Sequence, residues 1–171
     1  NKAIEIYNQV LELEPEHPAR CFLAELHANN NNMELAMELL VKHLEIYPTD
    51  IDAIHLKCTF LGQLGQWDEV ISLAEKLIEV NPHRSEFYNH LSLAYYTKDD
   101  YDKAIGFCQQ ALEIDPEYAV ALSNLGYTYL RTERWSEAKE VFEQYLKLAP
   151  EDDPNYIEVQ YQLETIEEKL T

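Results

Sequence analysis

Glycine, cysteine and basic residues are scarce in this chain of 171 residues, and each shortage excludes a class of chemistry. Its four glycines, at positions 62, 65, 106 and 126, cannot form a Walker loop or a GxGxxG dinucleotide motif. The three cysteines lack CxxC spacing, and the six histidines form no HxxxH or HExxH pattern. We therefore expect no catalytic residues, no cofactor and no metal site, and the chain is predicted not to be an enzyme.

The balance of charge is strongly acidic, with 13 Lys and Arg against 32 Asp and Glu and a net charge of −19. Such a charge repels phosphate groups, which argues against nucleic-acid partners and anionic membrane surfaces. The longest uncharged run, Tyr118–Leu130, has 13 residues, whereas a membrane-spanning helix needs about 20. No apolar signal segment opens the chain, and the odd cysteine count suits a reducing compartment, so we predict a cytoplasmic protein without membrane insertion. Because the first residue is Asn1 rather than methionine, we expect the natural chain to begin upstream.

Five prolines recur at intervals of 33 or 34 residues, at positions 15, 48, 82, 116 and 150. Each follows an apolar, mostly acidic segment, and proline cannot continue a helix, so these prolines mark helix ends at a fixed period. Small residues follow the same period, where two helices can approach closely. These small residues are Ala24, Cys58, Ser92 and Gly126. Each repeat is predicted to be two helices joined by a tight turn, near Asn30, Gly65, Asp99 or Glu133.

Two of these repeats carry family-like motifs. NLGYTYL at Asn124–Leu130 is followed by Ala138, Phe142 and Pro150, and the preceding repeat contains HLSLAYY at His90–Tyr96. These residues resemble the tetratricopeptide repeat family over nearly the whole chain. The resemblance implies an all-α fold, a right-handed α-solenoid of helix-turn-helix units with a C-terminal capping helix, in ten helices altogether. The single predicted array comprises a partial unit at 1–17, full units at 18–50, 51–84, 85–118 and 119–152, and the capping helix at 153–171.

In tetratricopeptide arrays the first helix of each unit lines a concave groove, and the resemblance places a set of residues of this chain there. These predicted groove residues are Glu25, Asp52, His55, Glu86, Asn89, Leu93, Tyr96, Asn124, Tyr127, Arg131 and Tyr161. The groove is acidic on balance, and the three tyrosines are expected along one strip. Family members that grip acidic chaperone tails use Lys and Arg, and the matching positions here contain neither. Those positions are Cys21, Glu25, Leu56, Glu86 and His90.

The predicted function is a non-catalytic protein–protein interaction scaffold that binds a partner segment, apolar with basic flanks, in this groove. Two alternatives stay open: a recognition or regulatory module of a larger multidomain enzyme, and a self-assembling structural array. A further alternative is that the tyrosines serve folding alone. The first helix is expected to leave an apolar stripe partly uncovered, which suggests self-association through this N-terminal helix. The stripe consists of Ala3, Ile4, Tyr7, Val10 and Leu11.

Overall fold

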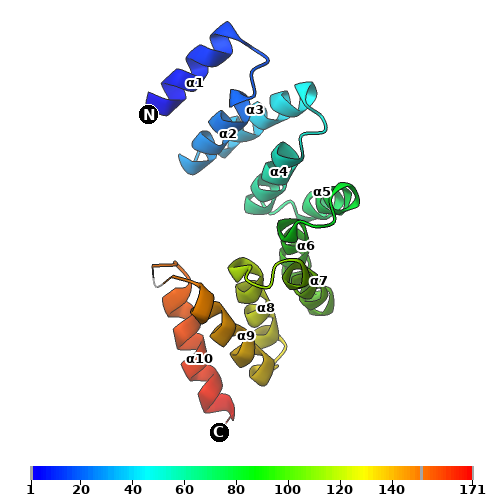
Figure 1. The fold of residues 1–171 in the computed structure, drawn as a ribbon, viewed down its shortest axis with the longest axis vertical. Coiled ribbons are helices and arrows are strands. Elements are labelled where there is room, and N and C mark those ends of the chain that lie inside the picture. The colour runs from blue at the N-terminus through cyan, green and yellow to red at the C-terminus, as the bar shows by residue number, and fades with distance from the viewer. Residues whose placement is uncertain (1, 151, 171) are drawn as a thin grey trace. The chain divides into compact units, whose positions relative to one another are not determined.

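The computed structural model describes residues 2–150 and 152–170, and this part of the chain forms ten α-helices and no strand. The helices are α1 (Lys2–Leu13), α2 (Ala19–Asn29), α3 (Met33–Ile46), α4 (Ile51–Gln63), α5 (Trp67–Val80), α6 (Ser85–Thr97), α7 (Tyr101–Ile114), α8 (Ala119–Arg131), α9 (Trp135–Leu148) and α10 (Tyr156–Leu170). Figure 1 shows this order, and the predicted all-α fold class is confirmed. The predicted first and last positions of the array, Asn1 and Thr171, lie outside the described residues.

Each helical hairpin turns through one residue in the left-handed backbone region. These residues are Asn31 (φ 59°), Gly65 (72°), Asp99 (58°) and Glu133 (57°). In every case the next residue donates its backbone N–H to the carbonyl five positions earlier, at 2.9–3.0 Å, which is the bond of a Schellman helix end. The four predicted turns are therefore confirmed, the first of them centred one residue later than Asn30.

Packing divides the chain into two compact units, Asn1–Leu73 and Ala74–Thr171, and each is described by itself. In the first unit α2 and α3 form a hairpin, α1 contacts α2, and α3 contacts α4. In the second unit α6 pairs with α7 and α8 with α9, α7 and α6 both contact α8, and α10 packs against α9. The boundary between the units falls inside α5, and the arrangement as one array stays a prediction.

The small-residue positions lie at close helix contacts, as predicted, and Gly126 shows why. A Cβ atom on Gly126 would lie 2.3 Å from Cε1 of Phe142, so glycine is required there. The fully buried Phe142 ring in turn packs edge-on against Tyr127, with ring centroids 5.2 Å apart and planes at 72°. The packing between α8 and α9 thus supports the side of α8 that bears Tyr127.

The cysteines at packing positions are buried free thiols. Burial raises the pKa of Cys58 to about 12 and that of Cys108 to about 11. Such thiols stay protonated and unreactive near neutral pH. Cys58 and Cys108 are therefore structural residues.

The first helix has no buried side chain. Ile4, Tyr7, Val10 and Leu11 are half-buried and Ala3 is exposed, as predicted for this stripe. Its contact with α2 includes a stack between the Tyr7 and Phe22 rings, whose centroids are 6.1 Å apart.

Candidate functional site

A pocket of about 200 Å³ lies between α6 and α8 in the second unit. Leu93 and Tyr96 line it from α6, and Asn124 and Tyr127 line it from α8. Each pair is three residues apart, a spacing that places both side chains on one helix face. The structure thus brings together four of the predicted groove residues.

Asn124, which lines this pocket, is bonded to Asn89, a predicted groove residue that lies outside the lining. Asn124 Nδ2 donates to Asn89 Oδ1 at 2.8 Å, which joins α8 to α6 across 35 positions of the sequence. An Asn side chain has two N–H donors and a carbonyl oxygen, so this bond uses only part of the capacity of each amide. The Asn124 amide therefore retains a donor and an acceptor for a ligand backbone.

Sequence reasoning did not assign two further lining residues, Ser92 and Thr128, to the groove. Both are almost fully buried, and their hydroxyl groups donate to backbone carbonyls of their own helices. Ser92 was recognised only as a small packing residue, and Thr128 lies one helical turn after Asn124. That i to i+4 spacing is the one signal that could have identified Thr128.

The two tyrosines that line the pocket rest on further aromatic rings. Tyr127 packs on Phe142, and Tyr96 packs edge-on against Tyr101, with centroids 5.6 Å apart. Burial, followed by the charge of Glu158 on α10, raises the pKa of Tyr127. Both rings are half-buried, so each combines structural packing with a surface open to a ligand.

The other predicted groove residues of the second unit lie outside the lining of this pocket. Arg131 is exposed, and its Nη2 donates to the Tyr101 hydroxyl at 3.3 Å. Glu86 lies in the first turn of α6, where its Oε1 is 3.4 Å from Arg84 Nη2. Tyr161 is on α10 and is 62% exposed. A strip shared by Tyr161 and the two pocket tyrosines stays a prediction.

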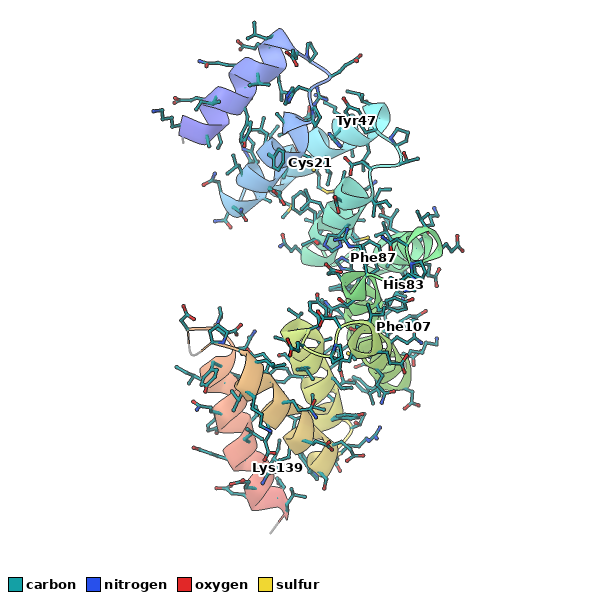
Figure 2. All side chains as sticks on the ribbon, viewed as in Figure 1. Cys21, Tyr47, His83, Phe87, Phe107 and Lys139 are labelled. Carbon is teal, nitrogen blue, oxygen red and sulfur yellow. The ribbon has the colours of Figure 1, made fainter. Side chains whose placement is uncertain are left out.

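A second and larger cavity, of about 530 Å³, lies in the first unit between α2, α4 and the C-terminal part of α3. The predicted residues Glu25, Asp52 and His55 line it. Sequence reasoning did not assign three other lining residues, Phe22, His43 and Asp50, to the groove. The half-buried Cys21, labelled in Figure 2, lines the same cavity from α2.

The electrostatics of this cavity are dominated by carboxylates. The pKa of Cys21 is raised to about 11, first by burial and then by the charges of Asp50, Glu25 and Asp52. Partial burial alone would raise the pKa of Asp50, but hydrogen bonds from the His43 side chain and the Ala53 backbone outweigh it, and the pKa is lowered. The cavity therefore has an anionic wall at neutral pH.

The buried His43 links this wall to the core. Its Nε2 is 2.8 Å from Asp50 Oδ2, and it exposes 1% of its surface. Asp50 also caps α4, because its Oδ1 accepts the Ala53 N–H at 3.1 Å. His43 is therefore a core residue that also lines the cavity.

Within residues 2–150 and 152–170, no three His, Cys, Asp or Glu side chains gather closely enough to hold a metal ion. None of the helices in the described part of the chain has the length and apolar character needed to cross a membrane.

Solved structures of low sequence identity share this fold. MamA from Desulfovibrio magneticus RS-1 is 23% identical over 89% of this chain and 86% of its own, with a TM-score of 0.75. A chain of the APC/C hetero-tetramer Cut9–Hcn1 gives a TM-score of 0.85 and 17% identity over 99% of this chain and 34% of that one. The first tetratricopeptide domain of Spaghetti (RPAP3), bound to the HSP90 peptide SRMEEVD, gives a TM-score of 0.64. It is 23% identical over 70% of this chain and 94% of its own. At these identities the likeness shows the fold alone.

Among curated proteins, none matches the chain significantly in sequence. Two family models described as tetratricopeptide repeat match it, one over residues 1–64 and 95–163 and the other over residues 61–119. These matches cover most of the chain and coincide with the helical hairpins described above. The chain belongs to the tetratricopeptide repeat family.

Proposed function

We propose that this chain binds an extended segment of a partner protein, apolar with basic flanks, at the predicted groove residues. Tetratricopeptide repeats form protein–protein interaction scaffolds and are generally non-catalytic. The observation that carries the proposal is the pocket between α6 and α8, which combines the half-buried rings of Tyr96 and Tyr127 with the amide of Asn124.

The size of this pocket suits one side chain of the partner. Its volume of about 200 Å³ is below the roughly 300–1,000 Å³ typical of sites for whole small molecules. Leu93, 37% exposed, and the rings of Tyr96 and Tyr127 provide its apolar surface. One apolar side chain enters here, while the Asn124 amide bonds to the backbone beside it.

Charge favours basic residues on both sides of that apolar residue. The net charge of −19 attracts Lys and Arg, and Glu158 lies close enough to act on Tyr127. The HSP90 peptide in the Spaghetti complex contains two glutamates and an aspartate. The positions that correspond to a carboxylate clamp have no Lys or Arg here, so an acidic tail is disfavoured. Complementary charge of this kind mainly accelerates association and selects the partner.

Selection from a displayed peptide library on the immobilised chain tests this function. We expect enriched peptides with one apolar residue flanked by Lys or Arg. Leu93→Ala and Asn124→Ala should each weaken the binding of such a peptide by about 2 kcal/mol or less, which is a loss of affinity of up to about 30-fold. Tyr88→Ala is the matched control, because Tyr88 is also on α6 and lies outside the pocket lining. Acidic enriched peptides, or binding lost only in variants that melt earlier, would contradict the proposal.

Self-association through α1 is a second candidate, and the observation in its favour is the incompletely covered apolar stripe. Light scattering over a range of concentrations tests it, with Ile4→Lys as the disrupting variant. A mass that rises with concentration in the original chain and not in the variant supports self-association, whereas a constant monomer mass excludes it.

We also propose a cytoplasmic location, which the three free cysteines support.

A further inference from the structure

We propose that the cavity of the first unit binds the guanidinium group of an arginine side chain in the partner segment. This inference rests on the proposed function, since that function calls for a partner with basic residues. The cavity measures about 530 Å³, is open to solvent on one side, and is lined by residues of α2, α3 and α4 with the loop before α4. Its occupant is assigned from three features: the acceptors on its walls, an unpaired buried nitrogen and an exposed aromatic ring.

Three carboxylates supply the acceptors. Glu25 comes from α2, Asp50 from the N-cap of α4 and Asp52 from the first turn of α4. All three act on the Cys21 thiol, which lines the same cavity, so their fields converge there. Asp50 already accepts from His43 and from the Ala53 backbone. A carboxylate can accept about four hydrogen bonds, so Asp50 retains capacity for a ligand.

His43 provides the second, independent indication of a donor ligand. It lines the cavity and is almost fully buried, and its Nδ1 has no hydrogen-bond partner. The Asp50 carboxylate can only accept a hydrogen bond, so Nε2 of His43 carries the hydrogen and donates it to Asp50. In the neutral ring, Nδ1 then has a lone pair. Buried polar atoms are normally hydrogen-bonded, so an unpaired nitrogen on a side chain that lines the cavity fits a ligand that brings N–H groups.

The distribution of these groups favours guanidinium over a metal ion. No three carboxylate, imidazole or thiol groups of the described residues are close enough to chelate one ion. A planar guanidinium offers five N–H donors and can reach acceptors that are spread over several walls. It also stacks on aromatic rings, and the Phe22 ring lines this cavity with 56% of its surface exposed. An ammonium group is a compact charge and makes less use of this geometry.

NMR titration of the ¹⁵N-labelled chain with L-argininamide tests the site, with L-lysinamide and magnesium chloride as comparison ligands. We expect saturable shifts at backbone amides of α2 and α4, and tighter binding of argininamide than of lysinamide. Glu25→Gln and Asp52→Asn should each lower the affinity for argininamide by about two- to fivefold, the size of effect expected for exposed ion pairs. Phe22→Leu should lower the affinity for argininamide more than the affinity for lysinamide. Glu45→Gln, an exposed charge change on α3 outside the cavity lining, should have no effect.

Three results would overturn the assignment: shifts that grow linearly without saturation, equal affinity for argininamide and lysinamide, or displacement of argininamide by equimolar magnesium. Circular dichroism of each variant shows that the helices are retained. If argininamide does not bind while peptides still depend on Leu93 and Asn124, this inference alone fails. If argininamide binds but no peptide is selected at the pocket between α6 and α8, the proposed function fails there and the guanidinium site stands.

Discussion

A single added methyl group at Gly126 should destabilise the second unit, whereas the same change at Gly106 should not. Both glycines lie inside helices, Gly126 in α8 and Gly106 in α7. A Cβ on Gly126 would lie 2.3, 2.6 and 2.7 Å from three ring atoms of Phe142, and a Cβ on Gly106 would have no neighbour within 4 Å. Gly106→Ala is therefore a control for helix propensity without the clash.

The expected magnitudes follow from two opposing terms. Replacing glycine by alanine within a helix contributes about 1 kcal/mol of stability. Overpacking a core costs about 1–3 kcal/mol, and the upper half of that range applies because three atoms of the buried Phe142 ring have to move. We expect Gly126→Ala to lower the free energy of unfolding by about 1–2 kcal/mol and Gly106→Ala to raise it by up to about 1 kcal/mol.

Urea unfolding followed by far-UV circular dichroism measures both variants. The displaced Phe142 ring packs against Tyr127, which lines the pocket between α6 and α8. Gly126→Ala should therefore also weaken the peptide selected on that pocket, and Gly106→Ala should leave its affinity unchanged. The reasoning is refuted if Gly126→Ala is as stable as the original chain, or if the two variants change stability in the same direction and by the same amount.

Three further predictions concern charge, thiols and a buried hydroxyl. Asp50→Asn should lower the free energy of unfolding by about 1 kcal/mol at pH 7. The bonds to His43 and Ala53 lower the pKa of Asp50 in the folded chain, so the difference in stability between the original chain and the variant should fade as the pH drops below 3.8. Denaturant titrations at several pH values measure this difference. Iodoacetamide at pH 8 should label Cys58 and Cys108 only as fast as the chain unfolds, because burial raises both pKa values; rapid labelling in the folded chain would contradict this. Tyr145→Phe removes a hydroxyl donor to a carboxylate in the α9–α10 connection and should cost about 1 kcal/mol, measured by urea unfolding against the original chain.

Local signals explain why the helices and turns were predictable. The phased prolines mark helix ends, and the residues at the turns, such as Asp99 and Gly65, tolerate left-handed backbone. The small residues at a fixed period, Gly126 among them, indicate where helices meet. Each of these features acts within one hairpin or repeats at one spacing, so the sequence alone was enough to predict ten helices and their order.

The predicted groove residues were only partly resolved by this reasoning. The family pattern identified Tyr96, Tyr127 and Asn124 as residues of one surface, but it could not tell that Tyr161 lies outside the lining of their pocket. It also passed over Thr128, because a hydroxyl that bonds to its own helix has no distinctive sequence pattern.

The amino-acid sequence by itself determined the repeat length, the helices, their turns and the acidic character of this protein. Only the tertiary structure decided that Asn124 donates to Asn89, that His43 bonds to Asp50, and that Phe22 remains exposed at the rim of an anionic cavity. Helix periodicity places a side chain on a face. Which two side chains meet across helices depends on their lengths, rotamers and the close approach of the backbones, and these are settled only when the helices pack.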